Sequence, residues 1–105
     1  MAAAHAVLTD TRQLRDLAGI GKSIEANLRS LGVTSIADLA LRDGDELYRQ
    51  LCVKTRTRQD PCVLDTFRCA VAQARNPRLP AAQRNWWWWS RQRKSGKLAE
   101  ISGLT

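Results

Sequence analysis

The chain has no long hydrophobic segment. None of its apolar runs approaches the roughly 18 residues that a membrane-spanning helix needs. Residues 1–9 also lack the basic flank and the apolar stretch of a signal peptide. These absences predict a cytoplasmic protein that does not use a membrane as a partner.

Residues that bind metals or carry redox chemistry are also scarce. The 105 residues include one histidine, His5, and three cysteines, Cys52, Cys62 and Cys69, with no CxxC pair. A zinc site needs ligands at closer, convergent spacing. On one helix, Cys62 and Cys69 would lie about 10 Å apart along the axis, too far for a disulfide. We therefore expect buried, reduced thiols and no metal or other cofactor.

Aromatic and acidic residues are few and unevenly placed. The chain has one phenylalanine and one tyrosine, and its four tryptophans are consecutive, from Trp86 to Trp89. Residues 1–76 carry 11 basic and 9 acidic groups, whereas residues 77–105 carry 6 and 1. The sequence thus divides into a flexible N-terminus (1–9), a nearly balanced domain (10–76) and a basic, tryptophan-rich C-terminal tail (77–105).

Two glycines, Gly19 and Gly21, separate two segments with helical apolar spacing. The pattern predicts a tight hairpin between two helices, because glycine adopts backbone conformations closed to other residues. The first amides of the second helix then lack intrahelical partners and can bind a phosphate oxygen. Lys22 and Ser23, in its first turn, can reach the same phosphate or the next. The predicted site is Gly19, Ile20, Gly21, Lys22 and Ser23; the alternative is a simple turn with a solvated lysine.

The stretch from Leu17 to Ile24 resembles the helix-hairpin-helix motif of many DNA repair, recombination and replication proteins. That resemblance implies a grip on DNA backbone that ignores sequence. Hairpins of this type often hold a monovalent cation through backbone carbonyls, which leaves no side-chain signature. Where those families often have a small residue, four positions after the second glycine, this chain has Glu25, with Ala26 beside it.

A longer resemblance rests on the block Asp-Pro-Cys-Val-Leu at residues 60–64, on the stretches 32–39 and 46–52, and on the tryptophans. These segments resemble the bacterial pathogenicity-locus family of short helix-hairpin-helix proteins. Members of that family are described in general terms as candidate DNA-binding proteins, and some carry a mitomycin-resistance label. Residues 32–47 also resemble the C-terminal domains of a competence regulator and of the RNA polymerase alpha subunit, which implies the same small helical fold.

Apolar spacing and capping residues predict an all-α, orthogonal bundle of five helices, similar to a sterile-alpha-motif domain. The predicted ranges are 10–17, 22–31, 35–41, 45–54 and 61–75. Asp60 can cap the last helix, with Pro61 at its first position. The apolar arc of this helix covers more than half its surface, which indicates a central position with Asp65, Arg68 and Arg75 on its exposed edge.

The connection from residue 53 to residue 60 takes the place of a second hairpin. It lacks a Gly-x-Gly pattern but carries Lys54, Arg56 and Arg58 separated by threonines. One interpretation is a side-chain phosphate clamp. The other is a basic loop that serves only solubility.

The tail combines Trp86, Trp87, Trp88 and Trp89 with three cations, Arg91, Arg93 and Lys94. One interpretation docks Trp86 and Trp87 on the helical core and leaves the other indoles partly exposed. In a second, the indoles stack on unpaired bases while the cations neutralise phosphates. In a third they dock a protein partner, since Trp and Arg are frequent hot-spot residues. A membrane-surface anchor ranks last, because the segment has no sustained amphipathic repeat.

We predict a non-enzymatic protein that binds DNA without sequence preference through the hairpin, in repair, recombination or related DNA metabolism. The alternative is a protein-interaction module that docks a partner through its tryptophans. Some DNA glycosylases pair such a hairpin with a lysine and a carboxylate, which Lys22 with Asp38 or Asp43 would match. Those enzymes need a second helical body to enclose a flipped base, and this chain is too short to form one.

Overall fold

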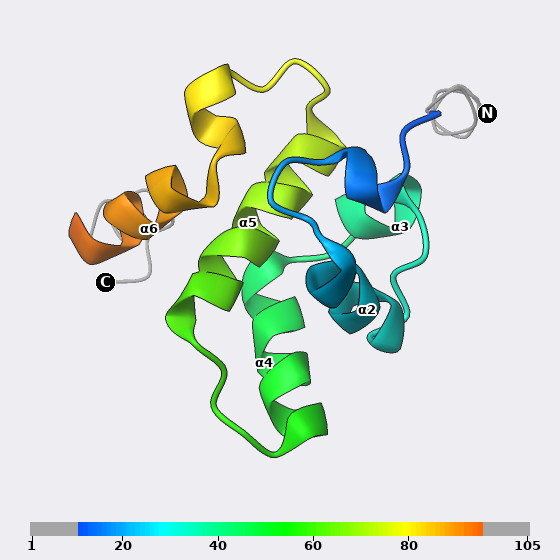
Figure 1. Ribbon diagram of the computed structural model, residues 1–105, viewed down its shortest axis with the longest axis vertical. Coiled ribbons are helices and arrows are strands. Elements are labelled where there is room, and N and C mark those ends of the chain that lie inside the picture. Colours follow the sequence, from blue (N-terminus) through cyan, green and yellow to red (C-terminus); the bar gives the residue numbers. More distant parts are fainter. Residues whose placement is uncertain (1–10, 96–105) are drawn as a thin grey trace.

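The protein is described by a computed structural model that covers residues 11–95. The predicted N-terminal segment (1–9) and the end of the tail lie outside these residues. Between residues 11 and 95 the structure has five α-helices, two short 3-10 helices and no strand (Figure 1). In chain order they are η1 (Leu14–Asp16), α2 (Lys22–Ser30), α3 (Ile36–Ala40), α4 (Gly44–Thr55), α5 (Pro61–Arg75), η2 (Ala81–Arg84) and α6 (Trp86–Ser95).

Four of the five predicted helices are confirmed to within one residue at each end. Side chains cap their starts: Ser35 and Asp43 cap α3 and α4 by accepting a hydrogen bond from an amide of the first turn. Asp60 caps α5 by accepting from the Cys62 amide, and Pro61 is the first residue of that helix. The all-α class and the small bundle are therefore confirmed.

The predicted first helix, 10–17, is wrong. Its described residues form one 3-10 turn, η1, with extended backbone at Gln13 before it and at Leu17 after it. Leu14 and Leu17 are both buried. One 3-10 turn brings residues three apart onto the same side, so it buries both leucines without a longer helix. Asp16 fixes the turn by accepting a 2.7 Å hydrogen bond from the Gln13 amide.

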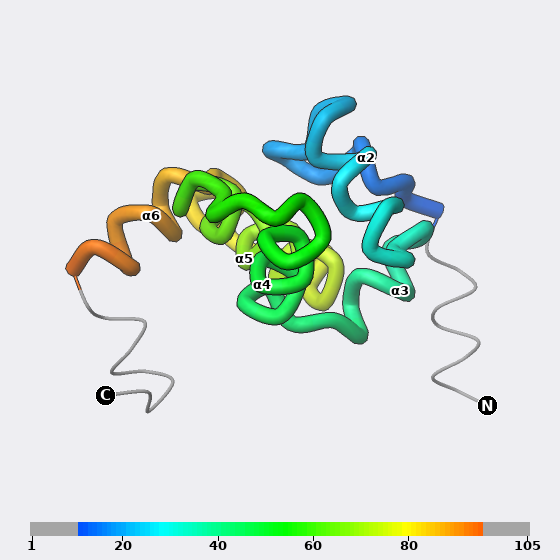
Figure 2. The backbone as a smooth tube through the Cα atoms, turned by 90° about the horizontal axis from the view of Figure 1, so that it is seen from below, coloured from blue at the N-terminus to red at the C-terminus, as the bar shows by residue number. Residues whose placement is uncertain are grey.

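The fifth α-helix is one that the sequence pattern did not predict. Residues 86–95, expected to belong to a tail, form α6, which packs against α5. Figures 1 and 2 both place α6 on one side of α5 and the pair α2 and α3 on the other. The basic, tryptophan-rich segment is therefore part of the folded body as far as residue 95.

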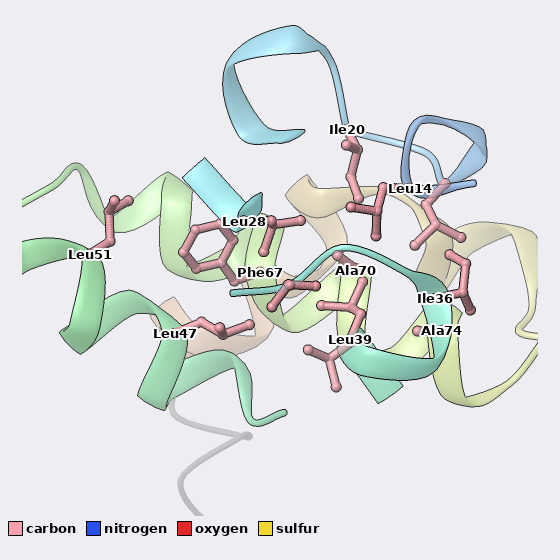
Figure 3. Close-up of a cluster of buried hydrophobic side chains, with 13 residues drawn as sticks. Leu14, Ile20, Leu28, Ile36, Leu39, Leu47, Leu51, Phe67, Ala70 and Ala74 are labelled. Carbon is pink, nitrogen blue, oxygen red and sulfur yellow. The ribbon is translucent and has the colours of Figure 1, made fainter. Parts of the chain in front are cut away.

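The hydrophobic core surrounds α5, as its wide apolar arc predicted. Phe67, Ala70 and Ala74 of α5 are almost completely buried. Figure 3 shows Phe67 beside Leu28 of α2 and Leu47 of α4. The remaining buried apolar side chains come from η1, the hairpin, the loop after α2, α3, α4 and α5 itself: Leu14, Leu17, Ile20, Val33, Ile36, Leu39, Leu51 and Val71.

One residue of the predicted exposed edge of α5 is buried. Asp65 is 0% exposed and accepts two hydrogen bonds from the Arg93 guanidinium of α6, at 2.9 Å and 3.0 Å. The prediction that placed Asp65 at the surface is thus wrong, because α6 covers this side of α5. Arg68 is half-buried and binds Asp45 of α4, while Arg75 is exposed and donates to the carbonyl oxygens of Ala40 and Arg42.

The N-terminus of α4 approaches α5 so closely that only glycine fits there. Gly44 is buried, and a Cβ atom added to it would lie 2.9 Å from the backbone nitrogen and Cα of Arg68. Backbone atoms in a packed helix have little freedom to move away. Gly44 therefore sets the distance between the two helices.

Replacing Gly44 by alanine tests this close approach. We expect Gly44→Ala to lower the free energy of unfolding by about 1–3 kcal/mol, because α4 must shift away from α5. Urea unfolding of the native chain and the variant measures the difference. At an open helical position the same change would stabilise the protein, so an unchanged or higher midpoint would show that the two helices separate without cost.

Removing the guanidinium of Arg93 tests whether its ion pair holds α6. Arg93→Met leaves a buried carboxylate without its cation, so we expect a loss of about 3–5 kcal/mol. Asp45→Asn, in the more exposed pair with Arg68, is the control and should cost about 1 kcal/mol or less. Unfolding followed by tryptophan fluorescence reports directly on α6, which carries all four indoles. Equal losses in the two variants would contradict a special role for the buried pair.

Candidate functional site

The predicted hairpin is a tight turn that leads directly into α2. Gly19 has a φ of 86°, a conformation that favours glycine. The Ile20 amide donates to the Leu17 carbonyl over 3.3 Å and closes the turn. Gly21 is extended and precedes the first residue of α2, and its carbonyl accepts the first helical hydrogen bond, from Glu25, at 2.9 Å.

The hairpin combines one buried anchor with an exposed polar surface. Ile20 is 6% exposed and belongs to the core, so only its backbone faces outward. Gly19, Gly21, Lys22 and Ser23 are exposed. Gly21 has no side chain with which to cap α2. The first amides of this nine-residue helix, with Lys22 and Ser23 beside them, therefore form a surface suited to an anion.

A buried glutamine of α5 fixes the hairpin from behind. The side chain of Gln73 accepts a 2.9 Å hydrogen bond from the Ala18 amide and donates a 3.0 Å hydrogen bond to the Ala18 carbonyl. Gln73 is 4% exposed. Both backbone groups of the residue before Gly19 are thus held by one side chain. Sequence reasoning missed Gln73; the available signal was a glutamine within the apolar arc of a central helix.

Glu25 occupies the position where related hairpins often have a small residue. Its carboxylate pairs with Arg15 of η1 at 2.8 Å and with Arg29 at 3.4 Å. The hydrogen bond from Arg15 is the largest cause that lowers the pKa of Glu25. Ala26 is exposed, so α2 does not turn to present it to its neighbours. In this chain an ion pair joins the two sides of the hairpin.

The basic connection between α4 and α5 lies apart from the hairpin. Lys54, Arg56 and Arg58 are exposed, and Arg56 has a left-handed conformation with φ 53°. Lys54 donates a 2.6 Å hydrogen bond to the carbonyl of Ser30, the last residue of α2. The hairpin lies at the other end of the same helix. Lys54 and the hairpin are therefore separated by the length of α2, about 13 Å. Figure 1 shows the connection at the C-terminal end of α4.

The tryptophans reverse the predicted pattern of docking. Trp86 and Trp87, expected to dock on the core, are exposed by 38% and 45%, whereas Trp88 and Trp89 are half-buried. The indole of Trp89 donates a 2.8 Å hydrogen bond to the Gln83 carbonyl, and its ring meets Trp88 edge-on. The prediction for Trp86 and Trp87 is wrong because the helical turn of α6 carries the second pair of indoles toward the interior.

The three predicted cations of the tail have different surroundings. Arg93 is bound to Asp65, and that carboxylate raises the pKa of the guanidinium. Arg91 and Lys94 are exposed, and the guanidinium carbon of Arg91 lies 4.4 Å from the centroid of the Trp87 ring. Only Arg91 and Lys94 therefore present free charge on α6.

None of the three cysteines forms a disulfide. All three are free thiols; Cys69 is buried, and Cys52 and Cys62 are half-buried rather than fully buried as expected. Burial raises the pKa of Cys69 to about 11, and the hydrogen bond with Asp60 raises that of Cys62. Within residues 11–95 no three His, Cys, Asp or Glu side chains gather as metal ligands. His5 lies outside that range.

Fold and surface together define a small all-helical domain with an anchored glycine hairpin. The chain belongs to the pathogenicity-locus family, Cdd1, whose family model matches residues 8–95 and so includes α6. It is similar to a mitomycin resistance protein, McrB, of Streptomyces lavendulae, with 40% identity over 86 residues, 82% of this chain and 78% of that protein. No solved structure matches the chain.

Among the described helices, none has the length and apolar character needed to cross a bilayer.

Substituting Gln73 tests whether it holds the hairpin. Gln73→Met removes both hydrogen bonds to Ala18 at similar side-chain length, so we expect a loss of about 1–3 kcal/mol in stability. We also expect faster hydrogen exchange at the Ala18 amide, measured by NMR.

Gln50→Met is the matched control for this test. Gln50 is half-buried on α4 and contacts Arg42 and Glu46, not the hairpin. This variant should leave Ala18 exchange unchanged. Equal Ala18 exchange in the native chain and Gln73→Met would show that the turn is stable without the glutamine.

Proposed function

We propose that the protein binds the sugar-phosphate backbone of DNA without sequence preference and without a catalytic step. The observation that carries the proposal is the exposed, uncapped N-terminus of α2, with Lys22 and Ser23 in its first turn and Ile20 anchored behind it. Backbone amides and a lysine that converge on one point suit a phosphate oxygen.

Rigidity of the hairpin supports the proposal. The turn is held by Gln73 through Ala18, by Ile20 in the core and by the Arg15–Glu25 ion pair. A binding surface that is already ordered loses little conformational entropy when a ligand binds. The anchored hairpin thus needs no rearrangement to present its amides.

The net charge and the resemblance of the hairpin to those of DNA-handling proteins support this proposal. The net charge is +7, which favours association with a polyanion. The hairpin resembles those of repair, recombination and replication proteins, and we propose a role in DNA metabolism of that kind. One hairpin makes few phosphate contacts, so we expect affinity on the order of micromolar or weaker at physiological salt.

Exposed basic residues elsewhere would lengthen the contact with DNA. Arg56 and Arg58 are exposed on the connection between α4 and α5, and Arg91 and Lys94 are exposed on α6. We propose that they meet phosphates other than the one bound at the hairpin. Arg93 is excluded from this role because Asp65 holds its guanidinium.

Reversing the charge of Lys22 tests the proposal. We expect Lys22→Glu to weaken binding to a fluorescently labelled duplex by about tenfold or more at low salt, since it places a carboxylate beside the bound phosphate. Fluorescence anisotropy at several salt concentrations measures the change. All variants keep the full chain, because removing α6 would uncover the side of α5 that it covers and take away the cation bound to Asp65.

Arg49→Glu is the matched control, because Arg49 is exposed on α4 and the change in net charge is identical. It also breaks the ion pair of Arg49 with Glu46, so circular dichroism checks that this variant keeps its helical content. If both reversals weaken binding equally, attraction is diffuse and the hairpin is not the site. If the native protein binds no DNA even at low salt, the proposal fails.

A protein-interaction module is the competing function, and the exposure of Trp86 and Trp87 is the observation that favours it. In that case the hairpin is only a turn between η1 and α2. Binding of a partner would then depend on these indoles and would be unaffected by Lys22→Glu.

A further inference from the structure

One side of α6 presents an aromatic ring and two cations to solvent. Trp87, Arg91 and Lys94 are spaced four and three positions apart, so they form one stripe along the helix. All three are exposed. The guanidinium of Arg91 lies over the Trp87 ring at 4.4 Å, and the ring remains 45% exposed.

The stripe is not what holds α6 in place. Ser90 is buried, Arg93 binds Asp65, and Trp89 donates its indole proton to the Gln83 carbonyl. These residues belong to the side of α6 that faces α5 and η2. Trp87, Arg91 and Lys94 are therefore available for a ligand without disturbing the packing of the helix.

The charge around the stripe favours an anionic ligand. Between residues 77 and 95 the sequence has five basic residues and no acidic one. Asp65 of α5 neutralises one of the five, Arg93. The segment thus has no acidic residue of its own to neutralise the others. A ligand that supplies both negative charge and a flat ring would complement the stripe.

We propose that the stripe of Trp87, Arg91 and Lys94 binds unpaired nucleotides of single-stranded nucleic acid. A base stacks on the pair of Trp87 and Arg91, while Arg91 and Lys94 neutralise the adjoining phosphates. In a duplex the flat faces of the bases are covered by their neighbours, so the stripe selects single strands. The inference rests on the proposed function and adds a second, chemically different surface to it.

The stripe and the hairpin are positioned by neighbouring residues of α5. Gln73 binds Ala18 of the hairpin and donates to the sulfur of Cys69, one turn earlier, at 3.4 Å. The Cys69 thiol donates to the Gln83 carbonyl at 3.5 Å, the same oxygen that accepts from Trp89. A chain of hydrogen bonds thus joins the two surfaces across α5.

The experiment compares three labelled probes by fluorescence anisotropy: a single strand of about 12 nucleotides, an abasic strand of equal length and a duplex. The abasic strand has the phosphates but no bases. We expect Trp87→Ala to weaken binding of the single strand about tenfold and to leave the abasic strand and the duplex unchanged. Leu41→Ala, at a side chain that is 84% exposed on another part of the surface, is the matched control and should change nothing.

Two results would overturn the inference. If Trp87→Ala weakens the abasic strand as much as the normal one, the indole acts by positioning Arg91 and not by stacking on a base. If it leaves the single strand unchanged, bases do not stack there and a protein partner becomes the better occupant. Circular dichroism of each variant checks that its total helical content is unchanged.

Lys22→Glu separates this inference from the proposed function. If it has no effect on any probe while Trp87→Ala weakens only the single strand, the hairpin proposal fails and the stripe stands. If Lys22→Glu weakens the duplex while Trp87→Ala has no effect, the hairpin stands and the stripe fails.

Discussion

Because α5 is covered by α3, α4 and α6, its polar side chains must find partners inside the protein. Asp65 obtains the guanidinium of Arg93, and Gln73 obtains both backbone groups of Ala18. Each of these bonds joins α5 to a segment far away in the sequence. The burial of one helix thus fixes the positions of both the hairpin and α6.

This constraint explains why the two candidate surfaces have opposite compositions. The hairpin presents backbone amides, so its anchors are side chains behind it: Ile20 in the core and Gln73 on α5. The stripe on α6 presents side chains, so its anchor is the opposite side of the helix, above all Arg93. In both cases the residues that hold the surface differ from the residues that would touch a ligand. Substitution can therefore separate loss of fold from loss of binding.

Local signals predicted most of the fold. Capping residues and prolines act within a few positions, so Asp60 and Pro61 marked the start of α5 correctly. The prediction of a helix over residues 10–17 was wrong because Leu14 and Leu17, three positions apart, fit a 3-10 turn as well as an α-helix. No local rule shows that Asp65 binds Arg93, 28 positions later. Without knowledge of that pair, the segment around Trp86 is predicted to be a tail outside the folded domain.

The candidate site, like the fold, could be predicted where local signals determine it and not where contacts between distant residues do. The hairpin follows from glycine spacing, and its exposed residues Gly19, Gly21, Lys22 and Ser23 are where the sequence placed them. The basic connection and the cations of α6 could not be positioned, because charge alone does not show which lysine or arginine is used inside the protein. Lys54 binds the end of α2 and Arg93 binds Asp65.

The same distinction separates diffuse attraction from a site. Every exposed cation adds to the long-range attraction that DNA feels, and salt screens that attraction over about 10 Å at 0.1 M. In the proposed function, a phosphate at the start of α2 would also meet oriented amides, whose direction is set by Ile20 and Gln73 and does not change with salt. Net charge alone would give binding that any lysine could supply, whereas the proposed hairpin site would make the identity of one residue, Lys22, matter. The proposed function therefore depends on where a charge lies on the folded chain, and not on the total of +7.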